Sequence, residues 1–134
     1  MSTMTTDLKV IDHGRAAVNA AISNLSHVIR IQGGYHVMRA DRIHLDRMRE
    51  ALRHRHVGYQ AAAARLVAER AAIAARAATQ DYDGPGGEWI IEAAEDLEAA
   101  ALNAESAFTA IAIRRGLPLA ESFDVAREWG IPTT

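Results

Sequence analysis

The chain is 134 residues long, the size of one domain, and its 49% of hydrophobic residues is enough for a core. Much of that fraction is alanine and aromatic residues make up only 5%, so we expect a thin core. The absence of cysteine excludes disulfides and thiolate metal sites. No stretch resembles a signal peptide or approaches the ~20 apolar residues of a membrane span, which favours a cytoplasmic protein in a reducing compartment.

The net charge of −2 hides an uneven distribution along the chain. Residues 13–76 carry eleven arginines and four acidic residues, whereas residues 77–134 carry three arginines and eleven acidic residues. The simplest account is pairing of a basic helix with an acidic helix, within one chain or between subunits. The alternative is a functional charge: a basic face for nucleic acid, or an acidic face for a basic groove.

The first predicted helix spans about residues 12–32. Residues 1–11 are expected to form a flexible N-terminal arm, and residues 12–134 a single helical domain. Asp12 is a suitable N-cap, and Gly33–Gly34 is a typical C-terminal stop. Apolar residues follow at the 4-3-4 spacing of one helix face: Val18, Ile22, Leu25 and Ile29.

A second, long helix is predicted over about residues 37–79. Every seventh residue is apolar, so the members of this stripe share one helix face: Met38, Leu45, Leu52, Tyr59, Leu66 and Ile73. Gly58 disfavours a helix by about 1 kcal/mol, but the phase continues across it, which favours continuity. A helix of ~43 residues is ~65 Å long, too long for a compact monomer, so the stripe predicts self-association.

The glycine-rich run Asp81–Gly87 predicts a loop, after which a third helix spans about residues 88–115 and stops at Gly116. Ile90, Leu97, Ala104 and Ile111 form one seam of this helix, beside Ala94, Ala101 and Phe108. A short fourth helix is expected over residues 119–129. Together these elements predict an all-α antiparallel bundle of long helices with coiled-coil-like packing.

Six histidines raise the question of a metal site. Glu50 and His54 are four residues apart, and Asp41 and His44 are three apart, so each pair shares a helix face. A closed site needs further ligands, which a second helix or subunit would have to supply. The sequence therefore predicts neither a metal nor another cofactor.

Acidic residues crowd the start of the third helix and define an acidic face: Glu88, Glu92, Glu95, Asp96 and Glu98. In all-α nucleotide pyrophosphatases, carboxylates from two helices bind magnesium for phosphate chemistry. Here the facing helix is rich in arginine, which favours neutralisation over coordination.

The densest basic run defines a basic face on the second helix: Arg42, Arg47, Arg49, Arg53 and Arg55. Such a face would bind phosphates in a strongly salt-dependent way. The run lacks the interleaved aromatic residues that stack on single strands. Sequence-independent nucleic-acid binding is therefore an alternative that is not favoured.

The segment 65–74 resembles part of the long first helix of helical chorismate mutases. In that family, arginines at the places of Arg53 and Arg70 bind the substrate carboxylates. The pattern departs where a family lysine is expected, since Asp81 stands there, and a later site residue would fall on Ile90. The resemblance therefore implies no family membership.

The leading hypothesis is a non-enzymatic helical interaction protein, a structural or adaptor subunit such as a phage or bacterial assembly component. It is expected to self-associate through the long central helix and to bind another protein, with no membrane partner. One alternative is a small inhibitor whose acidic helix engages a basic groove of a nucleic-acid-handling protein. Another is a small helical enzyme. The expected location is the cytoplasm, or the virion if the chain is phage-encoded.

Overall fold

The computed structural model describes residues 3–53, 57–81 and 87–116, and side chains at 6–31, 42, 45–53, 57–78 and 88–116. This part of the chain forms three α-helices and no strand: α1 (Thr3–Leu52), α2 (Val57–Asp81) and α3 (Gly87–Arg114). The predicted all-α bundle is confirmed. The short helix expected at 119–129 lies outside the described residues.

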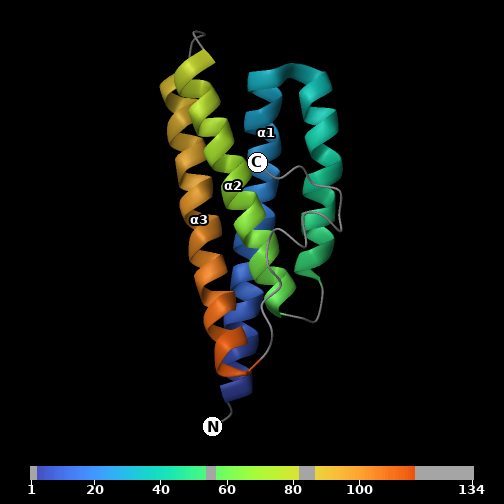
Figure 1. The fold of residues 1–134 in the computed structure, drawn as a ribbon, viewed down its shortest axis with the longest axis vertical. Helices are drawn as coiled ribbons and strands as arrows, with labels where there is room; N and C mark the ends of the chain where they lie inside the picture. The colour runs from blue at the N-terminus through green and yellow to red at the C-terminus, as the bar shows by residue number, and fades with distance from the viewer. Residues whose placement is uncertain (1–2, 54–56, 82–86, 117–134) are drawn as a thin grey trace.

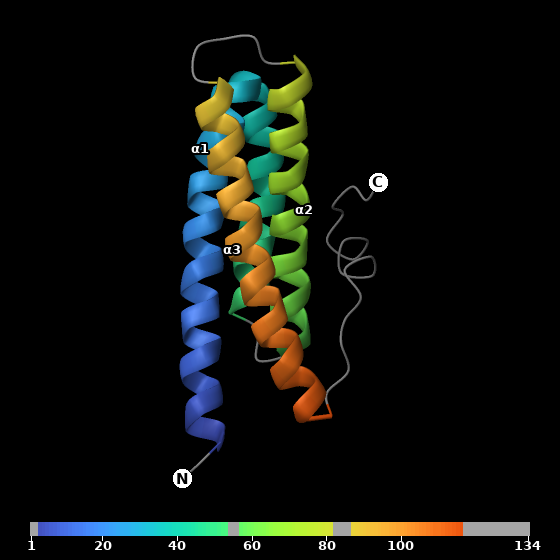
Figure 2. The same cartoon turned by 90° about the vertical axis from the view of Figure 1, so that its left-hand side faces the viewer.

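Helix α1 doubles back on itself (Figure 1). The reversal lies between Ile31 and Arg42, the interval that contains Gly33 and Gly34, whose low helix propensity favours a bend there. The expected stop at these glycines is thus a bend rather than an end. We call residues 3–31 the first limb and residues 42–52 the second limb. The two limbs, α2 and α3 lie side by side in an antiparallel bundle (Figures 1 and 2).

Two predicted helix boundaries are wrong. The helix expected over residues 37–79 is divided, because α1 ends at Leu52 and α2 begins at Val57. The Arg53 N–H donates to the Glu50 carbonyl at 3.0 Å in a turn that ends α1. The heptad phase continues past this break because both segments bury the same stripe in one core. The first helix begins at Thr3 rather than near residue 12, so residues 3–11 of the expected arm are helical.

The core lies between the two limbs of α1 and the helices α2 and α3. The expected stripe of the first limb is buried, as are both seams of α3, with Phe108 fully enclosed. Helix α2 contributes mainly alanines, including the run 61–64, and small side chains allow neighbouring helices to approach closely. The contact between α2 and α3 is the most extensive in the bundle. A thin core of this kind depends on close backbone packing more than on large side chains.

The C-terminus of α3 agrees with the prediction. Gly116 has φ of 68°, a conformation that glycine adopts without strain, and its N–H donates to the Ile113 carbonyl at 3.1 Å. None of the described helices combines the length and the hydropathy needed to cross a membrane.

Candidate interaction surface

The heptad stripe is largely covered within the chain. Leu45, Leu52 and Leu66 are buried, and Tyr59 is partly buried against the core. Ile73 is exposed, and the Met38 side chain lies outside the described part. The premise of one continuous helix too long for a compact monomer is therefore wrong, because the reversal in α1 and the interruption before α2 let the chain cover most of the stripe itself.

The acidic face lies on the outside of α3. Glu88, Glu92, Glu95 and Asp96 are exposed, and Glu98 is half-buried. Among the described residues, none of these five forms an ion pair. The ion pair that joins α2 to α3 uses Glu105 instead, 3.5 Å from Arg65. Pairing between the basic and acidic parts of the chain thus leaves the acidic face free.

The basic face lies on the second limb. Its exposed arginines are Arg42, Arg47 and Arg53, while Arg49 is half-buried and Arg55 lies outside the described residues. Asp46 is 2.6 Å from Arg49 Nη1 and 3.9 Å from Arg42 Nε. The second limb, which carries the basic face, and α3, which carries the acidic face, lie on opposite sides of the bundle (Figure 1).

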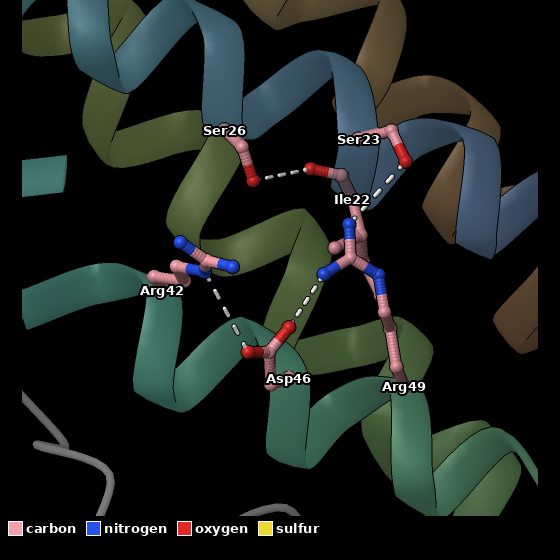
Figure 3. A network of polar contacts seen from close by, with 6 residues as sticks. All are labelled: Ile22, Ser23, Ser26, Arg42, Asp46 and Arg49. Atoms are coloured by element: carbon pink, nitrogen blue, oxygen red, sulfur yellow. Dashed lines mark hydrogen bonds and ion pairs between the residues drawn. The ribbon is translucent and has the colours of Figure 1, made fainter. Parts of the chain in front are cut away.

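Arg49 also links the two limbs of α1 (Figure 3). Its Nη2 donates to Ser23 Oγ at 3.3 Å, while Nη1 contacts Asp46 on its own limb. One turn beyond Ser23, Ser26 Oγ donates to the Ile22 carbonyl at 2.9 Å and therefore stays within its own helix. Arg49 thus has a structural contact, and the exposed part of the basic face is smaller than the sequence suggested.

A groove of about 430 Å³ lies between the first limb and α3. Figure 2 shows these two segments next to each other. The first limb contributes Lys9, Val10, His13, Gly14 and Ala17. The opposite wall is formed by Ala100, Asn103, Ala104 and Ala107. The groove exists because most of these side chains are small, and its polar side chains are Lys9, His13 and Asn103.

The floor of the groove is fixed by one close approach. A Cβ placed on Gly14 would lie 2.7 Å from Phe108 Cζ, closer than real Cβ atoms come to other heavy atoms. Phe108 is fully buried and packed on all sides. A side chain at position 14 would therefore force Phe108 to shift, which favours glycine there although glycine costs about 1 kcal/mol of helix propensity.

A buried carboxylate, Asp7, lies two residues before Lys9 of the groove. Arg114 donates to Asp7 Oδ1, and Arg115 Nε donates to Oδ2 at 3.1 Å. Burial raises the pKa of Asp7, but hydrogen bonds and charge from Arg114 and Arg115 outweigh it and hold the pKa below the ordinary value of 3.8. This contact joins the start of α1 to the end of α3.

In the described part of the chain, no three metal-ligating side chains come together. His13 and His27 are exposed on the first limb. The pairs considered from sequence cannot be placed, since His54 and the side chains of Asp41 and His44 lie outside the described residues.

Sequence reasoning missed the groove and the Asp7 contact. A partial signal for the groove existed, because Gly14 and Ala17 on one helix, and Ala100, Ala104 and Ala107 on another, are small residues at helical spacing. Spacing does not tell which helices meet, so this signal alone could not place a site. No local signal distinguishes Asp7 from an exposed aspartate.

No family model matches the chain, and comparisons with curated proteins and with solved structures found no match.

Proposed function

We infer that this chain is a non-enzymatic helical interaction protein, a structural or adaptor subunit that binds a second copy of itself and another protein. The observation that carries this proposal is the acidic face of α3, whose exposed carboxylates have no ion-pair partner among the described residues. Glu92, Glu95 and Asp96 repel one another across one turn of helix, which costs stability unless a partner compensates. A row of like charge beside an apolar groove is typical of a surface that recognises another macromolecule.

The route of interaction differs from the one that the sequence suggested. The heptad stripe is occupied within the chain, so the partner is expected to contact α3 and its neighbouring groove. A structural subunit of this kind would act in the cytoplasm, or in the virion if the chain is phage-encoded. The cysteine-free sequence suits a reducing compartment.

The test compares two baits in affinity capture from the native host. One bait carries Glu92→Gln and Glu95→Gln on the acidic face. The matched control carries Asp12→Asn and Glu50→Gln, which remove two exposed acids from α1. We expect partners of the wild-type chain to be retained by the control and lost from the acidic-face variant. Recovery of the same proteins by both variants would contradict the proposal.

A second candidate function is a small inhibitor that presents the acidic face to a basic groove of a nucleic-acid-handling protein. The exposure of the carboxylates on α3 favours this candidate as well, because an inhibitor must offer its charges without internal neutralisation. Competition separates the two functions. If nucleic acid displaces the chain from its captured partner, the inhibitor is supported. If both bind at once, the adaptor is supported.

A further inference from the structure

We propose that the groove between the first limb and α3 receives helix α3 of a second copy, in antiparallel orientation, and so forms a two-fold dimer. This inference rests on the proposed function and names one of its partners. Four features support it: the lining of the groove, the charge pattern of α3, the register between α1 and α3, and the exposed apolar side chains.

The lining of the groove is suited to a helix. It includes Gly14 and Ala17 on one side and three alanines of α3 on the other, with the larger Lys9, Val10, His13 and Asn103. Small side chains permit a third helix to approach both backbones closely, whereas large ones would hold it away. Helix α3 is ~40 Å long, so its outer face can contribute a contact of useful length.

The charges of α3 divide its exposed face into two parts. The acidic residues occupy the first three turns, and the exposed positions between 99 and 110 are uncharged and mostly small: Ala99, Leu102, Asn103, Ser106 and Ala110. A parallel pair of α3 helices would set acid against acid. An antiparallel pair centred near Leu102 sets the uncharged middle sections together and moves the two acidic rows to opposite ends.

The register between α1 and α3 supplies the complementary charge. Gly14 lies against Phe108, and Asp7 binds both Arg114 and Arg115. Lys9 and His13 therefore lie beside residues 109–113 of α3. In an antiparallel pair centred near Leu102, the acidic row of the second copy reaches this same level. Its Glu92 then lies beside Lys9 and its Glu95 beside His13, and the two-fold axis repeats both contacts.

The same arrangement covers exposed apolar surface. Leu102, Ile113 and Trp89 are 36%, 66% and 52% exposed on α3, and Val10 is exposed at the edge of the groove. In the antiparallel pair, Ile113 of one copy lies within about one turn of Trp89 of the other. A two-fold contact is also closed, so it gives a discrete dimer rather than a polymer.

Sedimentation velocity of the full chain at micromolar concentrations tests the dimer. We expect Asn103→Glu to raise the dissociation constant at least tenfold, because Asn103 lines the groove next to the centre of the antiparallel pair and two carboxylates would meet near the two-fold axis. The control is Ile73→Glu, since Ile73 is also exposed but lies on α2 and does not line the groove. Circular dichroism verifies that both variants remain folded. An equal effect of both variants would overturn the proposal.

A charge exchange tests the register. Lys9→Glu and Glu92→Lys should each weaken the dimer several-fold, and the chain with both changes should recover the wild-type constant. Cross-linking adds an independent readout, because the chain has no cysteine of its own. A short thiol-specific reagent should join Glu95→Cys chains to His13→Cys chains, but not to Ile73→Cys chains.

Failure of this inference can be told from failure of the proposed function. A wild-type chain that stays monomeric at all concentrations overturns the dimer. If capture of another protein still depends on Glu92 and Glu95, the self-association in the proposed function fails, but its binding of another protein through the acidic face stands. A dimer that dissociates with Asn103→Glu while the charge exchange shows no recovery overturns the antiparallel register.

Discussion

Gly14 of α1 lies so close to the ring of Phe108 in α3 that a methyl group on its Cα would come within 2.7 Å of Phe108 Cζ. This contact sets the distance between the first limb and α3, and with it the floor of the groove. It also places a glycine in the interior of a long helix, where glycine is otherwise unfavourable.

Gly14→Ala is expected to lower the free energy of unfolding by about 1–2 kcal/mol, because overpacking costs about 1–3 kcal/mol and the gain in helix propensity returns at most about 1. Urea unfolding followed by circular dichroism measures the change. In a Phe108→Leu background the same substitution should cost less, since the ring no longer opposes the methyl group. An unchanged cost there would show that the two residues are not coupled.

The Asp7 contact predicts a loss of stability in acid. Since the pKa of Asp7 is lower in the folded chain than in the unfolded chain, its contribution is fully present above about pH 4. It is lost as the pH falls through the lowered value. Asp7→Asn should be less stable than wild type at neutral pH, with a difference that shrinks in acid. Thermal unfolding across this range measures it, and Asp12→Asn, at an exposed aspartate, is the matched control.

Leu66 and Ile73 belong to one heptad stripe but differ in environment, with exposures of 4% and 39%. Leu66→Ala should reduce the free energy of unfolding by about 2–5 kcal/mol, because it leaves a cavity in the core. Ile73→Ala should stay within about 0.5 kcal/mol, as is usual for surface positions. Denaturant titration of both variants provides the measurement, and similar losses would contradict the burial described above.

Arg49→Ala removes the side chain that joins the two limbs of α1. The loss should be modest, up to about 1 kcal/mol, because the contacts with Ser23 and Asp46 are partly exposed. Arg47→Ala, at an exposed position of the same limb, is the matched control and should have a smaller effect. Amide hydrogen exchange in residues 23–31 would report the loosening directly, and equal exchange in both variants would argue against a linking role.

The sequence predicted the local features of this fold well. The apolar stripe of the first limb, from Val18 to Ile29, is buried as its spacing required. The seams of α3 are buried too, and its end at Gly116 follows from a conformation that favours glycine. These features depend on residues close in the chain, so periodicity and end signals are enough to find them.

The prediction was wrong where distant segments decide the outcome. The heptad phase from Leu52 to Tyr59 agreed with one continuous helix, yet α1 ends at Leu52 and α2 begins at Val57. A heptad pattern predicts burial of one helix face. It does not distinguish one helix from two consecutive helices that bury the same stripe. Self-association was therefore predicted from a stripe that other parts of the same chain largely cover.

The same distinction between local features and contacts of distant residues applies to the candidate surface. By itself the sequence determined an all-α chain, an acidic stretch at the start of α3 and a basic stretch before α2, because composition and periodicity are local properties. The tertiary structure alone decided that these stretches lie on opposite sides of the bundle, that Asp7 binds Arg114 and Arg115, and that Gly14 contacts Phe108. The physical reason is that the direction of each helix and the choice of its neighbours depend on contacts between residues far apart in the chain, whose combined packing energy no local pattern records.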